Sequence, residues 1–305
     1  MKKIVFKLFL ISILAVFTIA CESESTQDAE VKEDSTEVSD QNNDQNDEIS
    51  NPNRVTMVPT PNELFDIIKE LNISYDEQIL NSPDNIERYT DKRAQSLNFG
   101  VYTADLAFAA SFGNPTASAK YFTIIKDMGD LLNINNALDQ TVFDQIDKSI
   151  QSNNNDELFK LSNDTYYDAY TYLKENERGP SLALIVLGGW VESLYIMTQL
   201  GEYEEGSMLV SRIIDQKYTL ENLYEFMQEY ESVDVDVLEM MAMLMPIDEV
   251  FLNLEESTVD EFSNSSENEV NLMDGGADYS MTEDQYNHLK SAVNELRTKI
   301  VESDF

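Results

Sequence analysis

Apolar residues recur at helical spacing along nearly the whole chain after Thr60, and the alternation typical of a half-buried strand is scarce. Helix start signals accompany this pattern. Thr60 suits an N-cap, Pro61 suits the first turn of a helix, and Glu63 suits the acidic position of a capping box. The pattern therefore predicts an all-α fold for residues 57–305.

The same pattern divides this region into about eight to ten helices. The first is predicted from residue 60 to 71. The second opens at Ser82-Pro83 and runs to Arg93, from where it either continues to residue 112 or breaks near residues 98–100. The third helix is predicted to begin at Asn114-Pro115, and the last one at Thr282. Between them, further helices are predicted at 137–150, 156–177, 181–200, 205–217, 219–231 and 234–254. Residues 257–280 are polar, contain glycine and are predicted to form a loop.

The segment from Leu182 to Leu200 is apolar on almost every side, and Glu192 is its only charged residue. A helix that is apolar all round is buried on all its faces. Its length would also suit a membrane span, but its glycines and polar residues favour the centre of a helical bundle. Gly188 and Gly189 would let a neighbouring helix approach closely. We therefore expect a multi-helix bundle, or an irregular helical array, around a buried helix near 181–200.

The first 20 residues have a different character. Three lysines within residues 1–7 precede an apolar run of about 13 residues, which is typical of an export signal and shorter than the roughly 20 residues of a spanning helix. The following Thr18-Ile19-Ala20-Cys21 resembles the bacterial lipobox, although Thr18 stands where leucine is commonest. This resemblance implies that Cys21 is acylated and becomes the first residue of a mature lipoprotein. The alternative is a secreted protein with an incidental free cysteine. Cys21 is the only cysteine in the chain and cannot pair within it, which is also what a lipid attachment site would leave.

Residues 21–56 are predicted to form a disordered, acidic tether. Between residues 22 and 53 the chain has eleven acidic residues, one basic residue (Lys32) and no aromatic residue, so it has too little apolar surface to fold. The acids after Cys21 also loosely resemble the surface-export signals of Bacteroidota lipoproteins. A plain acidic linker is the alternative interpretation.

Net charge narrows the range of partners. The chain has 58 acidic and 20 basic residues, for a net charge of −38. Removal of residues 1–20 takes away three lysines and no acid, which leaves 17 basic residues and a charge of −41. Such an anion is repelled by nucleic acids and anionic headgroups. We expect no nucleic-acid partner, attachment to the lipid bilayer through acylated Cys21, and an envelope protein as a candidate partner.

Few residues are suited to catalysis. The single histidine, His288, lies on the polar side of the last predicted helix, so no Cys/His zinc site and no Ser–His pair is expected. No phosphate-binding glycine motif occurs, and we expect neither a metal nor a cofactor. Asp105 and Glu192 remain, because both acids lie in apolar surroundings. If they converge in an open cleft, they would suit a carboxylate-dependent hydrolase.

The alternative for these acids is structural, with each one paired to a basic or tyrosine side chain. The candidate partners are Arg88, Arg93, Lys120 and Tyr195.

Aromatic and methionine clusters give further candidates for binding. Trp190, Tyr195 and Tyr102 are weak candidates, since exposed rings could stack on sugars or aromatic ligands. The clusters are Tyr166, Tyr167, Tyr170 and Tyr172 on one helix, and Met240, Met241, Met243 and Met245 on another. Methionines can line an adaptable apolar pocket. For both clusters the alternative, which we favour, is that they fill a helical core, with the tyrosines also suited to its wet edge.

Two further resemblances bear on function. Residues 200–206 look like the turn of a tetratricopeptide repeat, but no second copy follows at that period, and one unit cannot form a solenoid. Segments at residues 58–63, 97–106, 188–195 and 215–217 are similar to helical Bacteroidota envelope lipoproteins of unassigned function. We therefore expect an outer-membrane lipoprotein, with surface exposure as a further option. We expect it to act as a non-enzymatic binding or scaffold module rather than as an enzyme.

Overall fold

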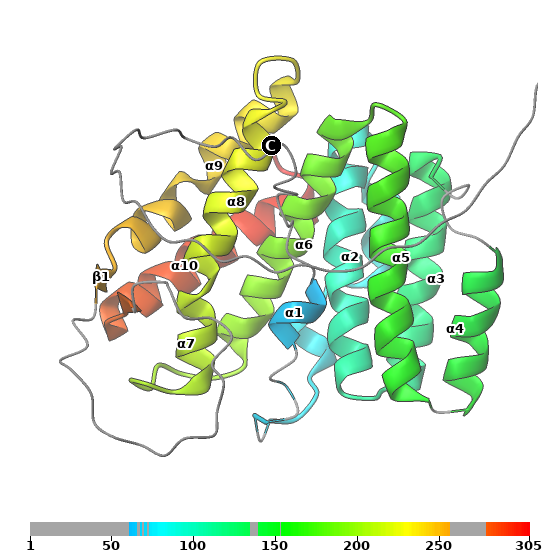
Figure 1. Ribbon diagram of the computed structural model, residues 1–305, viewed down its shortest axis with the longest axis horizontal. Coiled ribbons are helices and arrows are strands. Elements are labelled where there is room, and N and C mark those ends of the chain that lie inside the picture. Colours follow the sequence, from blue (N-terminus) through cyan, green and yellow to red (C-terminus); the bar gives the residue numbers. More distant parts are fainter. Residues whose placement is uncertain are drawn as a thin grey trace, which may run out of the picture. The chain divides into compact units, whose positions relative to one another are not determined.

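The computed structural model describes residues 61–65, 68, 70, 71, 73–134, 140–152, 154–256 and 279–305. Nearly all of them lie in helices, and the only strands among them have two residues each, so the predicted all-α fold is confirmed (Figure 1). The predicted signal at 1–20, the lipid-bearing Cys21 and the tether at 21–56 lie outside the described residues.

The elements follow the predicted order. The helices are α1 Pro61–Phe65, α2 Lys92–Ser111, α3 Pro115–Leu132, α4 Gln140–Ser152, α5 Asn155–Glu175, α6 Gly179–Gln199, α7 Met208–Ile214, α8 Gln216–Gln228, α9 Val235–Leu252 and α10 Glu283–Glu302. Two short 3₁₀ helices, η2 Glu77–Ile79 and η3 Pro83–Arg88, precede α2. The strands β1 Glu255–Glu256 and β2 Tyr279–Ser280 pair antiparallel after α9.

Helices α2 and α6 form the centre of the body and make the most extensive contact in it. Three glycines allow their backbones to touch. A Cβ atom on Gly188 would collide with the carbonyl of Leu97, and one on Gly100 would collide with the carbonyl of Ile185. The predicted close approach at Gly188 and Gly189 is therefore confirmed, and its counterpart on α2 is Gly100.

Helix α6 is buried along nearly its whole length, as its sequence predicts. It is the single helix in the described part of the chain that is long and apolar enough to cross a membrane, and 89% of its apolar window is buried inside the body. Protein rather than lipid therefore surrounds α6. Each fully buried Leu, Ile or Val in it contributes about 1.5–3 kcal/mol to stability.

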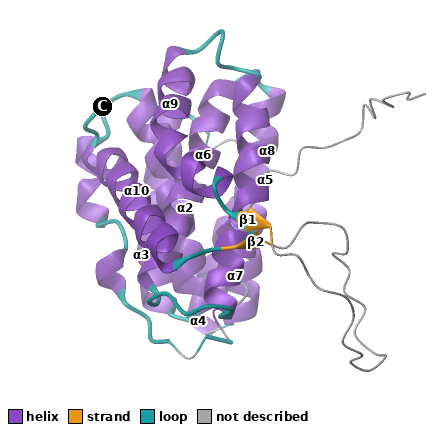
Figure 2. Cartoon of the chain, turned by 90° about the vertical axis from the view of Figure 1, so that its left-hand side faces the viewer, coloured by secondary structure: helices purple, strands orange, loops and turns teal. Residues whose placement is uncertain are grey.

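The other helices pack around this central pair. Helices α3, α4 and α5 lie on one side, and α8, α9 and α10 lie on the other (Figure 1). Figure 2 shows α9 and α10 at the surface, with the β1–β2 pair below the end of α9. Helix α9 contacts α10, α8 and α6, so one of its faces is turned away from the body.

Several predicted boundaries were wrong. Ser82-Pro83 opens the short 3₁₀ helix η3 rather than a long α-helix, and α2 starts afresh where Asp91 caps the backbone N–H of Ala94. Of the two alternatives at residues 98–100, the helix continues without a break, and Gly100 lies there against the backbone of α6. The predicted loop 257–280 ends in the paired residues Tyr279 and Ser280, and residues 257–278 lie outside the described part.

Candidate functional site

Asp105 and Glu192, the two acids singled out from the sequence, converge with a third charged residue in the middle of the body. Glu192 of α6 receives two hydrogen bonds from the guanidinium of Arg297 on α10, each 2.9 Å long. Arg297 also stacks over the ring of Tyr195, 4.5 Å from its centroid. The Asp105 carboxyl lies within hydrogen-bonding reach of Glu192, and its Oδ2 accepts from the backbone N–H of Asn81 at 3.2 Å.

The guanidinium of Arg297 is thus the one positive charge beside two buried carboxyl groups, those of Asp105 and Glu192. Burial raises the pKa of Asp105 well above its ordinary value, and the negative charge of Glu192 raises it further. Arg297 opposes this rise but lies against Glu192. A protonated Asp105 can donate to Glu192 through Oδ1, which otherwise has no hydrogen-bond partner. The cluster is then one neutral acid beside one ion pair, with no net charge.

This cluster is linked to the ends of neighbouring helices. Asn98 donates to the carbonyl of Ile300 at 2.9 Å, and Tyr89 donates to that of Val301 at 3.2 Å. Both carbonyls belong to the last turn of α10, which lacks helical donors. The polar groups therefore join α2, α6, α10 and the segment before α2, which is a structural role.

The cluster has no opening for a substrate. Asp105 and Glu192 are both 0% exposed. A glycoside hydrolase needs its two carboxyl groups to flank a bond of the substrate in an open cleft. The structure therefore brings the two acids together but does not favour the hydrolase. The partner of Glu192 is Arg297, which was not among the four candidates suggested by the sequence.

The three aromatic candidates also lie inside the body. Trp190 is buried and donates from its indole nitrogen to Gln216 at 3.1 Å. Tyr102 is buried and donates to the carbonyl of Ser82 at 2.8 Å, and Tyr195 is half-buried under Arg297. Trp190 and Tyr102 therefore present no ring to a ligand, and Arg297 covers one face of the Tyr195 ring. The tyrosines of α5 point in different directions, since Tyr166 is buried and Tyr167 is exposed.

Helix α9 presents the most unusual surface in the described part of the chain. Its inner seam faces the core with a heptad spacing and comprises Val237, Met240, Leu244, Ile247 and Phe251. A second heptad series, here called the outer seam, faces away from the body and comprises Val235, Leu238, Ala242, Met245, Glu249 and Leu252.

The outer seam is apolar but exposed. Val235, Leu238, Met245 and Leu252 are 65, 49, 64 and 66% exposed. With Val233, they make up five of the ten large exposed hydrophobic residues among the described residues, all within 20 positions of the chain. Single exposed apolar residues are ordinary, but a cluster marks a binding surface.

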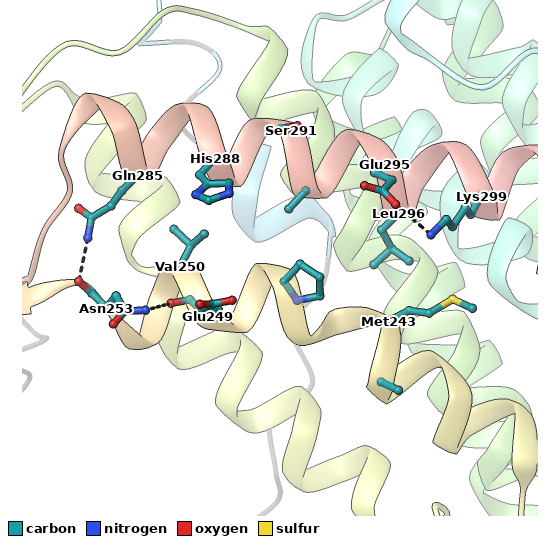
Figure 3. A pocket seen from close by; sticks show the side chains of 13 residues that line it. Met243, Glu249, Val250, Asn253, Gln285, His288, Ser291, Glu295, Leu296 and Lys299 are labelled. Carbon is teal, nitrogen blue, oxygen red and sulfur yellow. Dashed lines mark hydrogen bonds and ion pairs between the residues drawn. The ribbon is translucent and has the colours of Figure 1, made fainter.

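A groove runs beside this seam, between α9 and α10 (Figure 3). Its volume is about 370 Å³. The side chains of Val250 and Leu296 are buried at its base, and Met243, His288 and Glu295 line it. Two hydrogen bonds close one end, where Gln285 donates to the carbonyl of Asn253 and Asn253 donates to that of Glu249. The groove therefore offers apolar floor and polar rim to a ligand that lies along α9.

A shallower depression lies on the opposite side of the seam, between α9 and α8, and is lined by Leu238, Met241, Met245 and Tyr224 among others. The methionine cluster is thus divided between two roles. Met240 and Met241 fill the core, whereas Met243 and Met245 line the two hollows. The outer seam is a ridge between them, and ridges of one helix pack into the grooves of another.

Pro246 lies inside α9, next to the groove. It has no N–H group, so the carbonyl of Ala242 lacks its regular helical donor. Ala242 is exposed and borders both hollows.

Metal binding finds no support in the described ranges, where no group of three or more His, Cys, Asp and Glu residues is arranged to hold an ion. His288 lines the groove as an exposed side chain. Its place next to polar groups suits a hydrogen-bonding role there.

No protein-family model, curated protein or solved structure matches this chain. The resemblance to helical Bacteroidota lipoproteins therefore stays a prediction. The candidate site rests on the chain's own geometry.

Two features of the candidate sites were missed from the sequence. Arg297 was overlooked because it is 105 residues from Glu192. The helical pattern of α10 shows on which face of the helix Arg297 lies, but not which residue it pairs with. The outer seam was overlooked because α9 has two overlapping apolar series, and the sequence does not say which of them faces inward.

Proposed function

We propose that the protein is an envelope lipoprotein, held at the membrane by acylated Cys21, whose helical body binds a protein partner through the outer seam of α9. The single observation that carries the binding role is the exposed apolar ridge from Val235 to Leu252. The lipid anchor rests on the basic and apolar residues 1–20 and on the lipobox-like Thr18–Cys21. An outer-membrane location, with the body displayed at the cell surface, belongs to the same proposal.

The net charge of the chain supports a lipid anchor that attaches the protein and a helical body that binds the partner. A body this acidic is repelled by anionic headgroups, so the lipid has to supply the attachment. Two or more acyl chains anchor stably, whereas one is marginal. The body is then free to present a surface to a neighbouring envelope protein.

The anchor is tested by replacing Cys21→Ser in the producing cells. The variant should leave the membrane fraction and lose labelling by a fatty-acid analogue, while the wild-type protein keeps both. Unchanged labelling of the variant would overturn the lipoprotein proposal.

The binding role is tested by placing a photoreactive amino acid at Met245, and separately at Leu131 as a control. Leu131 is also exposed but lies on α3, away from α9. Irradiation of intact cells should give a crosslinked product at Met245 and much less at Leu131. Absence of any product from either position, or from further exposed positions on the body, would contradict a binding module.

A further inference from the structure

Helix α9 contributes only acidic charged residues at and beside the outer seam, whereas α10 contributes His288 and Lys299 to the groove, where Lys299 pairs with Glu295 at 3.0 Å. In heptad terms, the seam residues occupy positions a and d, and the positions beside them are e and g. The acids at or beside the seam are Asp234, Glu239, Asp248 and, within it, Glu249. Helix α9 has no Lys or Arg at any position.

Part of this acidity is already neutralised within the body. Arg93 of α2 pairs with Glu239 at 2.6 Å and with Asp236 at 3.4 Å, near the start of α9. Within the described part of the chain, no Lys or Arg forms an ion pair with Asp248 or Glu249. Burial raises the pKa of Asp248, and nearby Lys217 lowers it, but Lys217 pairs with Glu221. Asp248 and Glu249 in the second half of α9 therefore place negative charge beside apolar side chains, without an ion pair from the described residues.

We propose that the partner contributes an amphipathic helix that packs along the outer seam and has Lys or Arg beside its apolar stripe. This inference rests on the function proposed above and names the chemistry of the partner. Helix α9 has 18 residues and is about 27 Å long, enough for five turns of a partner helix. The hollows on either side of the ridge would receive side chains of that helix.

Glu249 would set the register. It is the one charged residue in an otherwise apolar seam, and a single polar residue at such a position fixes alignment at some cost in affinity. A Lys or Arg of the partner opposite Glu249 would compensate for its burial. An apolar residue there would leave the carboxylate buried without a partner, which is strongly unfavourable.

Other occupants fit less well. A second copy of this chain would place acidic flank against acidic flank in either orientation. Residues 257–278, which follow α9, contain six acids and no base. The tether at 21–56 is also acidic, and residues 1–20 are basic but belong to the predicted signal, which is absent from the mature chain.

The test uses the mature chain with Cys21→Ser, which keeps it out of membranes, and two synthetic helical peptides of about three heptads. Both peptides have the same apolar stripe. One has Lys at every flanking position and opposite Glu249, and the other has Glu there. Fluorescence anisotropy gives the dissociation constant of each.

The Lys peptide should bind at least about tenfold more tightly than the Glu peptide. Met245→Glu should weaken its binding by about tenfold or more, whereas Leu131→Glu on α3 should leave it unchanged. Glu249→Lys should weaken binding of the Lys peptide by about tenfold or more and so narrow the preference between the two peptides, because the other acids beside the seam remain. Circular dichroism of each variant shows that the body still folds.

Equal affinity for both peptides, no binding of either, or unchanged binding after Glu249→Lys would overturn this inference. Those results would leave the binding role itself standing if Met245 still crosslinks in cells to a partner of other chemistry. A crosslink from Met245 to a second copy, or to another segment of the same chain, would also overturn it. The two proposals therefore fail in distinguishable ways.

Discussion

Helices α6 and α9 both have apolar residues on more than one face, but only α6 is enclosed by other helices. Helix α6 is surrounded by α2, α5, α8, α10 and other helices, and even its one acid is buried. Helix α9 buries its inner seam and leaves the outer seam in solvent. The comparison shows that a helix with two apolar faces needs a packing partner on each of them. For α9, the described residues cover the inner seam and leave the outer seam exposed.

The largest expected effect comes from adding volume to α6. Gly188→Leu places a side chain where the carbonyl of Leu97 lies, so α2 and α6 have to separate. Because backbone rather than a flexible side chain blocks this position, we expect a loss in the free energy of unfolding of more than about 5 kcal/mol, beyond the roughly 1–3 kcal/mol of ordinary overpacking, so that the cooperative unfolding transition disappears. Urea denaturation followed by circular dichroism measures it.

The matched control is Ala242→Leu on the outer seam, which adds similar volume to an exposed position. Its effect should stay within about 0.5 kcal/mol. A loss as large as that of Gly188→Leu would mean that the outer seam is covered by another part of this chain.

The buried charge of α6 gives the next effect. Arg297→Leu leaves the Glu192 carboxylate in the core without its two hydrogen bonds. We expect a loss of about 3–5 kcal/mol in the free energy of unfolding, again measured with urea. Adding Glu192→Leu to this variant should restore part of that loss, whereas Glu249→Leu on α9 alone should be nearly neutral.

The pH dependence of stability gives a smaller effect with a defined sign. Because its folded pKa is raised, Asp105 binds its proton more tightly in the folded state than in the unfolded chain. Its stabilising contribution is complete below the unfolded pKa of about 4 and is lost as the pH rises through the folded pKa.

Asp105→Asn should flatten this decline and raise stability at neutral pH. An amide can still donate to Glu192 and accept from the N–H of Asn81, so it resembles the protonated acid. Thermal melts between acidic and neutral pH measure the change, with Glu249→Gln as the exposed control. A steeper decline in the Asp105→Asn variant would contradict the protonated state.

The smallest effect on folding is expected on the outer seam. Leu238→Glu with Met245→Glu should change the free energy of unfolding by no more than about 0.5 kcal/mol per site, because both side chains are exposed. The same variant should lose the crosslinking and peptide binding described above. Loss of folding together with binding would show that the seam is part of the core.

The fold was largely predictable because its signals are local. Caps at Asn114 and Thr282 start α3 and α10 where the sequence places them, and the apolar run around Gly188 identifies the central helix. The start of α2 was not predictable from Ser82-Pro83, since a proline start signal suits a 3₁₀ turn as well as an α-helix.

The candidate site was less predictable because it depends on tertiary packing. Asp105 and Glu192 were correctly singled out as acids in apolar surroundings, but their convergence and the role of Arg297 arise from three helices that are distant in sequence. The outer seam of α9 is visible as a heptad. Its exposure depends on how α8, α10 and α6 divide the other faces of α9.

The pairing of Glu255–Glu256 with Tyr279–Ser280 has a practical consequence. This pairing holds the two ends of the intervening 22-residue segment next to each other, so an insertion within that segment does not have to change the distance between α9 and α10. Lengthening such a loop costs little, about 0.6 kcal/mol for each doubling. A fluorescent reporter domain could be inserted there, a few residues beyond Leu252, to signal when the ridge on α9 becomes occupied.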